Sequence, residues 1–490
     1  MAPAGYGNKQ YQVSIGEELG DRKSLSGGTV TTNTVTGLSG LTNRKYSGQV
    51  ARVLSDTAAI LGHTYHLDNN STTVLTFQEN VATATLDSGD VLFLGNRNSR
   101  ETVCTRALKI GEDFTPASGE RDLYSGYYAG TGNQPTEIVH YKWAFDGSLP
   151  IVPHDLSWLY LIFGHEYTTG TDSGTGGSTL AEATQIGETV FDVVSATGYA
   201  ADDYIQVDVT TTAEIRQITD VTSNTITVDR PLRIAHASGV ACNEVTSDFA
   251  HNFAFSDTSP LPSYCLESVS KALSPSLVYR NPGLRIESWD VSATSDGPLG
   301  VTLGYKSCDY SALEDDGSTA LAASSVTYTG VDSPYIHKPG NTALAINGIS
   351  YAQVQRWKWT GKRALKTEWM DYEDTTGECH FRDSTKPYDH YPGNIENTLE
   401  LEILVTNKNL YNLVANDTSF TVTIPVSHPA DGTLTNNFTL TFASCKAPSA
   451  MQKFSSKDGP SFYTFKATAG TVTCVGNDRT PYYLMGGLST

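Results

Sequence analysis

The sequence lacks the features that mark several large classes of protein. No apolar run approaches the ~18 residues of a membrane span, so no spanning segment is expected. The first residues have neither a basic region nor an apolar core, so we expect no signal peptide. The seven cysteines are scattered and form no Cys-x-x-Cys pair, which argues against a zinc site or a disulfide framework. They are expected to be buried thiols of a protein assembled in a reducing cytoplasm.

Positive charge is also scarce. The chain has 33 Lys and Arg against 53 Asp and Glu, which gives a formal net charge of −20. Tight binding to phosphates needs clustered Lys and Arg, so a protein that grips nucleic acid is not expected. The same acidity would suit a protein along which DNA has to slide, and it would also suit a salty environment.

Motifs of catalysis and nucleotide binding are missing as well. The chain contains no G-x-S-x-G, Walker A, G-x-G-x-x-G or H-E-x-x-H sequence. His236 has no Cys, Glu or Asp at ligand spacing apart from Asp229, and we expect it to be a corner residue after a strand. The sequence therefore predicts neither an enzyme nor a cofactor.

Two groups of residues could be imagined to hold a metal ion, but ordinary structure explains both. His63 and His66 lie in a stretch that reads as extended chain, where positions i and i+3 point to opposite faces. The second group lies in a Pro-containing stretch that is typical of a polar loop: Cys379, His380, Asp383, Asp389 and His390. We expect no metal site.

What the sequence does contain is the pattern of an all-β protein. Short apolar runs are separated by Ser, Thr, Gly, Asn and Asp. Alternation of apolar and polar residues predicts half-buried antiparallel strands, which together make a sandwich, at 299–306, 399–405, 420–426 and 438–442. One or two short helices are expected. The first is 154–164, capped by Asp155 and ended by Gly164, and 409–417 is a helix or a turn.

Composition divides the chain into three parts. Residues up to about 50 are polar and rich in Gly and Thr, which predicts an extended arm without a core of its own. Residues 168–179 contain no apolar side chain and are typical of a linker. The region after them reads as four or five short strands of a small β-barrel. We therefore expect a core made of residues 1–180 and 247–490, with 181–246 inserted as a small β domain.

Five stretches, in order, resemble the tail tube proteins of long-tailed viruses of bacteria and archaea. The inserted part is similar to a small β domain of that family in "AADDYIQV", "AEIRQI" and "VDRPLRIAHASG". The stretch "DFAHNFAFSDTSPLPSYCLE" resembles the strand that re-enters the core, and "NPGLRIESWDVSATSDGPLGVTLGY" resembles the central hairpin. The run "HYKWAFDGSLPIVPHDLSWLYLIFG" and the closing part from "LELEILV" to "NNFTLTFASCKAP" match the order of the remaining strands and helices. The resemblance covers roughly 140–475 and leaves the first 140 residues unmatched.

The resemblance implies a structural protein of the virion. Members of the family form hexameric rings that stack into a hollow tail tube, through which viral DNA passes at ejection. Inner sheets from six subunits close into one barrel, which removes their exposed edges. The implied partners are further copies of the chain, the tape measure protein and the terminator or baseplate proteins. Double-stranded DNA passes transiently, no membrane is involved, and the subunit is assembled in the host cytoplasm.

Two questions stay open at this stage. Glu400 and Glu402 are our candidates for facing the lumen of such a tube, although an ordinary exposed strand face explains them equally well. An extracellular carbohydrate-binding adhesin is the alternative function. Trp357 and Trp359, which share a strand face, would be its sugar platform, or they belong to a core or an interface. A β-rich hydrolase is a third class, for which no carboxylate pair stands out.

Overall fold

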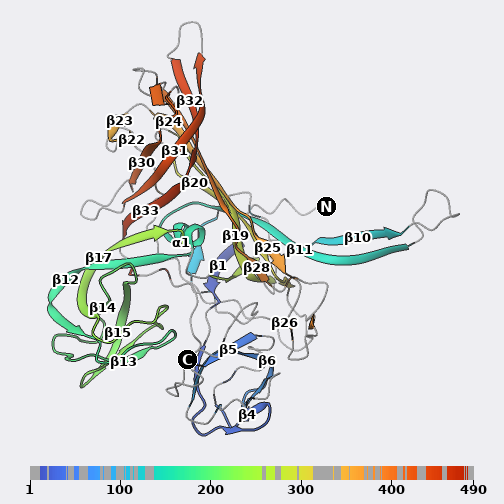
Figure 1. Ribbon diagram of the computed structural model, residues 1–490, viewed down its shortest axis with the longest axis vertical. Helices are drawn as coiled ribbons and strands as arrows, with labels where there is room; N and C mark the ends of the chain where they lie inside the picture. Colours follow the sequence, from blue (N-terminus) through green and yellow to red (C-terminus); the bar gives the residue numbers. More distant parts are fainter. Residues whose placement is uncertain are drawn as a thin grey trace.

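The computed structural model is an all-β protein, which confirms the fold class expected from the alternating sequence (Figure 1). Strands make up 64% of it and helix makes up 3%. The structure describes residues 11–18, 21–39, 41, 49–53, 64–77, 81, 86, 90–94, 104, 106–110, 114, 120–126, 137–256, 261–270, 277–294, 297–312, 335, 344–351, 354–368, 372–373, 379–380, 387, 389–404, 412–413, 416–427, 437–454, 461–478, 480–481 and 483.

The largest sheet, here called the long sheet, runs in the antiparallel order β11-β20-β19-β24-β29-β32-β31. Its strands are β11 Glu137–Ile151, β19 Leu277–Thr294, β20 Gly300–Ser307, β24 Val354–Arg363, β29 Ile395–Leu404, β31 Asn437–Phe454 and β32 Ser461–Ala469. The strands expected at 299–306 and 399–405 correspond to β20 and β29, so both predictions are confirmed.

A second sheet faces the long sheet and runs β12-β17-β33-β31-β30-β22-β23. Its further strands are β12 Glu166–Thr179, β17 Ala241–Ala254, β22 Leu344–Ile346, β23 Ile349–Tyr351, β30 Phe420–Ser427 and β33 Thr471–Asp478. Strand β31 pairs with β33 over its first part and with β32 over its second, so it belongs to both sheets. The strands expected at 420–426 and 438–442 are confirmed as β30 and part of β31.

A third sheet, β9-β1-β18-β19-β21, closes one end of the sandwich. Its further strands are β1 Tyr11–Glu17, β9 Arg106–Leu108, β18 Tyr264–Ser270 and β21 Ser311–Ala312. Strand β19 is 18 residues long and connects this sheet to the long sheet. Two small hairpins pair β25 Lys366–Glu368 with β28 Asp389–Tyr391 and β26 Tyr372–Glu373 with β27 Cys379–His380.

The core between the sheets contains the helix α1, Ser157–Phe163, whose seven residues are all buried. This confirms the short helix expected at 154–164, and Gly164 ends it with a left-handed φ of 70°. The cap expected of Asp155 needs correction. Leu156 occupies the N-cap position, and the Asp155 carboxylate accepts a hydrogen bond from the Ser157 N–H (2.9 Å) and pairs with Arg106. Of the second expected helix, at 409–417, the structure describes 412–413 as helical and 416–417 as a turn, and the Asn416 N–H donates to the Asn412 carbonyl (3.0 Å).

Residues 168–179 are not the linker that their composition suggests. They belong to β12, which pairs with β17 as a ribbon that leads from the second sheet into the inserted region, with register shifts after Gly170 and Asp172. Glycine at position 170 allows this pairing, because a Cβ there would lie 2.6 Å from the Cβ of Val245. The expected boundary at 246 falls inside β17, so the chain enters and leaves the insertion through strands.

The inserted region forms a separate hydrophobic cluster. Its strands are β13 Val190–Asp192, β14 Tyr204–Val207, β15 Glu214–Thr222 and β16 Thr225–Val228, with the neighbouring parts of β12 and β17. The cluster is built from residues of 180–242, among them Leu180, Phe191, Ile205, Ile218, Ile226 and Cys242. It lies apart from the sandwich in Figure 1, at the far end of the β12–β17 ribbon.

The N-terminal region contradicts the extended arm expected from its composition. Its sheet has the order β2-β8-β5-β6-β7-β4-β3, with a core of its own (Figure 1). The strands are β2 Asp21–Ser24, β3 Thr29–Val30, β4 Thr34–Thr36, β5 Gln49–Val53, β6 Thr64–Asn70, β7 Val74–Phe77 and β8 Val91–Leu94. The few apolar residues before position 50, such as Leu25 and Val35, pack against strands beyond it, so a window of 50 residues could not show the core.

A long hairpin projects from the sandwich. Strand β10, Glu120–Gly126, pairs with the first part of β11, from Glu120↔Ala144 to Gly126↔Glu137. The second part of β11 pairs with β20 inside the long sheet. The hairpin therefore continues an edge strand of the long sheet well beyond the sandwich (Figure 1).

Candidate functional site

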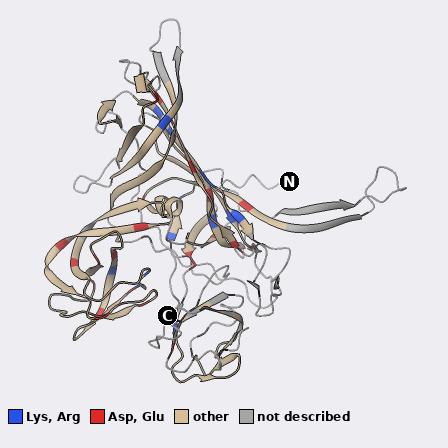
Figure 2. Cartoon of the chain, viewed as in Figure 1, with Lys and Arg blue, Asp and Glu red and all other residues tan. Residues whose placement is uncertain are grey.

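The outward face of the long sheet is where the candidate residues Glu400 and Glu402 lie. In β29 from Asn397 on, and in β24 from Trp357 on, every second residue is buried and the residues between are half-buried or exposed, because successive side chains point to opposite faces. Both signs of charge occur along these strands (Figure 2). We call this surface the charged face, and its ionic residues are Asp146, Asp290, Lys306, Arg356, Lys358, Lys362, Glu396, Glu400, Glu402, Lys446 and Lys466.

The pairing of β24 with β29 places opposite charges across from each other. The register gives three cross-strand pairs, here called the charge ladder: Arg356↔Glu402, Lys358↔Glu400 and Lys362↔Glu396. Residues directly opposite in an antiparallel pair have Cβ atoms about 5 Å apart, so each carboxylate is near a cation. The same rule holds at the other edge, where Lys306 of β20 faces Asp146 of β11.

Ion pairs connect the ladder to its neighbours. The Glu400 carboxylate lies 3.1 Å from the Lys466 ammonium on β32, and these side chains are 41% and 63% exposed. The Lys358 ammonium lies 2.5 Å from the Asp290 carboxylate on β19. Water screens such pairs, so they stabilise the fold little. Their consequence is electrostatic: Glu400 and Glu402 belong to a face of mixed charge and not to an acidic surface.

The layer beneath the charged face is aromatic and rigid. Trp357 and Trp359 are fully buried, and the Trp359 indole N–H donates to the Asn397 side-chain oxygen (2.9 Å). Arg363 is buried with them, and its guanidinium donates to the Ile162 carbonyl (2.9 Å) and lies over the Trp289 ring. Burial lowers the pKa of Arg363 to about 10. The two tryptophans are core residues, so they cannot form the sugar platform of the adhesin alternative.

A buried ionic network joins the inserted region to the core. The Arg233 guanidinium donates to the Glu17 carboxylate of β1 (3.0 Å) and lies over the Tyr160 ring of α1 (4.8 Å). Burial raises the pKa of Glu17 even though Arg233 opposes this shift. Burial acts against the charge of Arg233, but Glu17 and Tyr160 raise its pKa above the ordinary value.

Glu214 organises the other side of this network. Its carboxylate accepts hydrogen bonds from the Arg233 N–H (2.9 Å) and the Ile234 N–H (2.7 Å), and it pairs with Arg216. Burial acts to raise its pKa, but Arg216 and these donors lower it below the ordinary value. His236 is buried beside it, with its Nε2 atom 3.5 Å from Glu214 and its Nδ1 atom 3.8 Å from Asp208. The residues around His236 in the sequence did not indicate that Glu214 and Asp208 lie beside it.

The structure does not assemble the imagined metal sites. In the residues that it describes, no group of three His, Cys, Asp or Glu could hold a metal ion. Extended chain is confirmed at 64–66, and His63 lies outside the described residues, as does Asp383. Residues 389–391 are a strand and not the expected loop, because they pair with β25. Asp389 and His390 are buried, and the Asp389 carboxylate pairs with Arg285 (3.1 Å). Burial lowers the pKa of His390.

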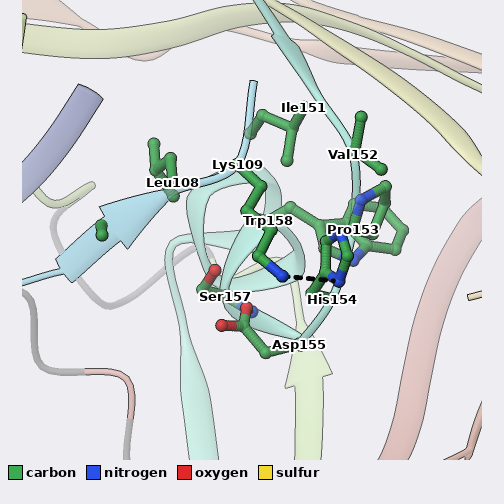
Figure 3. A pocket seen from close by; sticks show the side chains of 10 residues that line it. Leu108, Lys109, Ile151, Val152, Pro153, His154, Asp155, Ser157 and Trp158 are labelled. Carbon is green, nitrogen blue, oxygen red and sulfur yellow. Dashed lines mark hydrogen bonds between the residues drawn. The ribbon is translucent and has the colours of Figure 1, made fainter. Parts of the chain in front are cut away.

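A small pocket lies where β9 and the end of β11 meet the start of α1 (Figure 3). It is lined by Lys109, His154, Asp155 and Trp158 among others, and the Lys109 ammonium lies 3.2 Å from the His154 Nδ1 atom. Its free volume is about 20 Å³, enough for one water molecule. It is too small for an organic substrate.

Comparisons with known proteins add no relative. No family model matches the sequence, and no curated protein is significantly similar to it. In the described part of the chain, no helix is long and apolar enough to cross a membrane. The six cysteines whose side chains the structure describes are buried free thiols, as expected: Cys104, Cys242, Cys265, Cys308, Cys445 and Cys474.

Proposed function

We propose that this chain is the subunit of a viral tail tube. Copies of it join edge to edge into hexameric rings, and the rings stack into a hollow conduit for the genome. The protein is then a structural part of the virion tail, assembled in the host cytoplasm, and not an enzyme. Its partners are further copies of itself, the tape measure protein and the terminator or baseplate proteins.

The observation that carries this proposal is the projecting hairpin of β10 and β11. An isolated two-stranded hairpin is at best marginally stable in water, so one that leaves the sandwich needs another surface to cover it. A neighbouring copy in an assembly provides such a surface. The hairpin also continues the edge of the long sheet, where unpaired N–H and C=O groups favour pairing with a further chain.

The two edges of the long sheet support ring closure. Within that sheet, the second part of β11 pairs with β20, and the second part of β31 pairs with β32. Each edge therefore offers a ladder to a neighbour, and pairing β11 of one copy with β31 of the next would repeat around a ring. Closing the sheet in this way removes both edges, as in any barrel.

Electron microscopy of the purified chain tests the proposal directly. Rings or hollow filaments with sixfold symmetry are expected. A variant without residues 121–143 removes the hairpin, with the facing pair Glu120 and Ala144 joined by an Asn-Gly turn. It is expected to stay monomeric while keeping the far-ultraviolet circular dichroism of the sandwich. A wild-type chain that remains monomeric at high concentration contradicts the proposal.

A further inference from the structure

The net charge of −20 does not show that one strand of the charged face carries a row of cations. The acidity of the chain would suit a surface that lets DNA pass, yet β24 carries a row of three cations, Arg356, Lys358 and Lys362. Arg356 and Lys362 are exposed and Lys358 is half-buried. On their own, three cations spaced along the outward face of one strand would attract a phosphate backbone.

The acidic row on β29, which is Glu396, Glu400 and Glu402, lies directly across from these cations. Each of the three cations has a carboxylate directly across the ladder, and Lys358 has a second one in Asp290. The remaining lysines of the charged face are also matched. Lys306 faces Asp146 and lies 3.7 Å from Glu287, Lys446 lies 3.0 Å from Asp417, and Lys466 lies 3.1 Å from Glu400. Opposite signs face each other at the three ladder pairs, at Glu400↔Lys466 and at Asp146↔Lys306, whereas Lys306 also faces Arg285 of β19, whose own carboxylate partner is Asp389.

We infer that Glu396, Glu400 and Glu402 neutralise the cationic row of β24, so that duplex DNA moves past the charged face without being held. A phosphate that approaches a cation of the ladder also approaches the carboxylate across from it, which repels the phosphate. The usual gain from releasing counterions is therefore small. This inference rests on the proposed function, because it makes the charged face the wall along which DNA passes.

The inference predicts that DNA binding appears when the acidic row loses its charge. In the variant E396Q/E400Q/E402Q, amides replace the carboxylates at nearly constant shape. Arg356, Lys362 and Lys466 then lose the carboxylate that faces them, while Lys358 keeps Asp290. Binding of a fluorescent 20-base-pair duplex, measured by anisotropy at about 50 mM salt, is expected to tighten at least about tenfold over the wild type. With three freed cations, the affinity should fall about 40-fold between 50 and 200 mM salt.

Two matched controls separate this effect from a change in net charge or a loosened sheet. The variant E182Q/D202N/D220N makes the same change in net charge at exposed positions of the inserted region, and it should bind DNA no better than the wild type. The variant R356Q/K358Q/K362Q disturbs the same ladder from its other side and should also fail to bind.

The inference is wrong if E396Q/E400Q/E402Q gains no affinity while it remains folded, or if E182Q/D202N/D220N gains as much. It is also wrong if the wild type binds the duplex as tightly as the ladder variant does. The proposed function fails separately, through microscopy of the wild type. A monomeric chain whose ladder variant binds DNA would contradict the tube and leave the charge assignment standing.

Discussion

His251 lies where β12, β17 and β33 meet, between the carboxylates of Glu166 and Asp478. Its Nδ1 atom contacts Glu166, its Nε2 atom lies 3.0 Å from Asp478, and the ring is fully buried. Burial alone would lower the pKa of His251, but the two carboxylates outweigh it and raise the pKa to about 10. At neutral pH the ring is therefore a buried cation that holds three strands of the second sheet together.

This histidine should make the fold less stable as the pH rises. Its pKa is raised above the unfolded value of about 6.5, so its stabilising effect is complete below that pH and declines toward pH 10. Between pH 7 and 8 the free energy of unfolding should fall by about 1.4 kcal/mol, and His251→Gln should remove this slope. Urea unfolding at both pH values measures it as the difference in slope between the wild type and His251→Gln, because unfolded thiols with a pKa of about 8.5 begin to ionise in the same range. His154→Gln, at the pocket edge, is the control and should keep the slope.

Glu214 allows a second prediction at the scale of single residues. Replacing it by Ala leaves Arg216 buried without its carboxylate and frees the Arg233 and Ile234 amides. The free energy of unfolding should fall by about 3 kcal/mol. Hydrogen exchange of those two amides should accelerate, which a general loss of stability would not confine to them. Glu182→Ala, at an exposed site, should change stability by less than about 0.5 kcal/mol. Unchanged exchange at the two amides would contradict the assignment.

These residues show why local sequence reasoning found so little of the buried network. Arg233 and Glu17 are 216 residues apart in the chain, and nothing in the spacing of either stretch indicates the other. The same limit applied to His236, which read as a lone corner histidine, because Asp208 and Glu214 approach it only through the fold of the insertion. Titratable partners that come together through tertiary structure leave no periodic signal.

At the scale of elements, prediction succeeded where one strand face is buried and failed where pairing uses the backbone alone. The strands β20, β29 and β30 alternate strictly, so their existence and their buried faces could be read directly. Strand β12 is rich in Gly, Ser and Thr and was interpreted as a linker, because it has no apolar face to show. Its strand character comes from the partner β17, and such non-local pairing is absent from composition.

The charge ladder could be predicted only in part. Glu400 and Glu402 could be placed on an outward strand face from the alternation of β29, and the structure places them there. Their cationic partners could not be found, because the register of β24 against β29 joins segments about 40 residues apart in sequence. Shifting that register by one residue would bury the charges and expose Trp357 and Trp359. The hydrophobic layer therefore fixes the ladder.

At the scale of the whole molecule, the chain is a sandwich that carries two further clusters, one in the N-terminal sheet and one in the insertion. The insertion is connected to the sandwich through the β12–β17 ribbon, and its Arg233 guanidinium donates a hydrogen bond to the core residue Glu17. The long sheet and its hairpin lie elsewhere in the structure (Figure 1). If assembly depends on the long sheet, the insertion decorates the outside and polymerisation does not need it.

Removing the insertion tests this separation. The ribbon offers a clean point of excision, because Asp172 faces Val245, and a two-residue turn can join them after residues 173–244 are removed. The variant also needs Glu17→Gln, because loss of Arg233 would otherwise leave a buried carboxylate without its cation. Tyr160 can still donate its hydroxyl hydrogen bond to the amide oxygen. The shortened chain is expected to form tubes of the same symmetry and a smaller outer diameter, as seen by electron microscopy, with Glu17→Gln in the full-length chain as the control. A shortened subunit that keeps its circular dichroism and stays monomeric would show that the insertion takes part in the contacts between subunits.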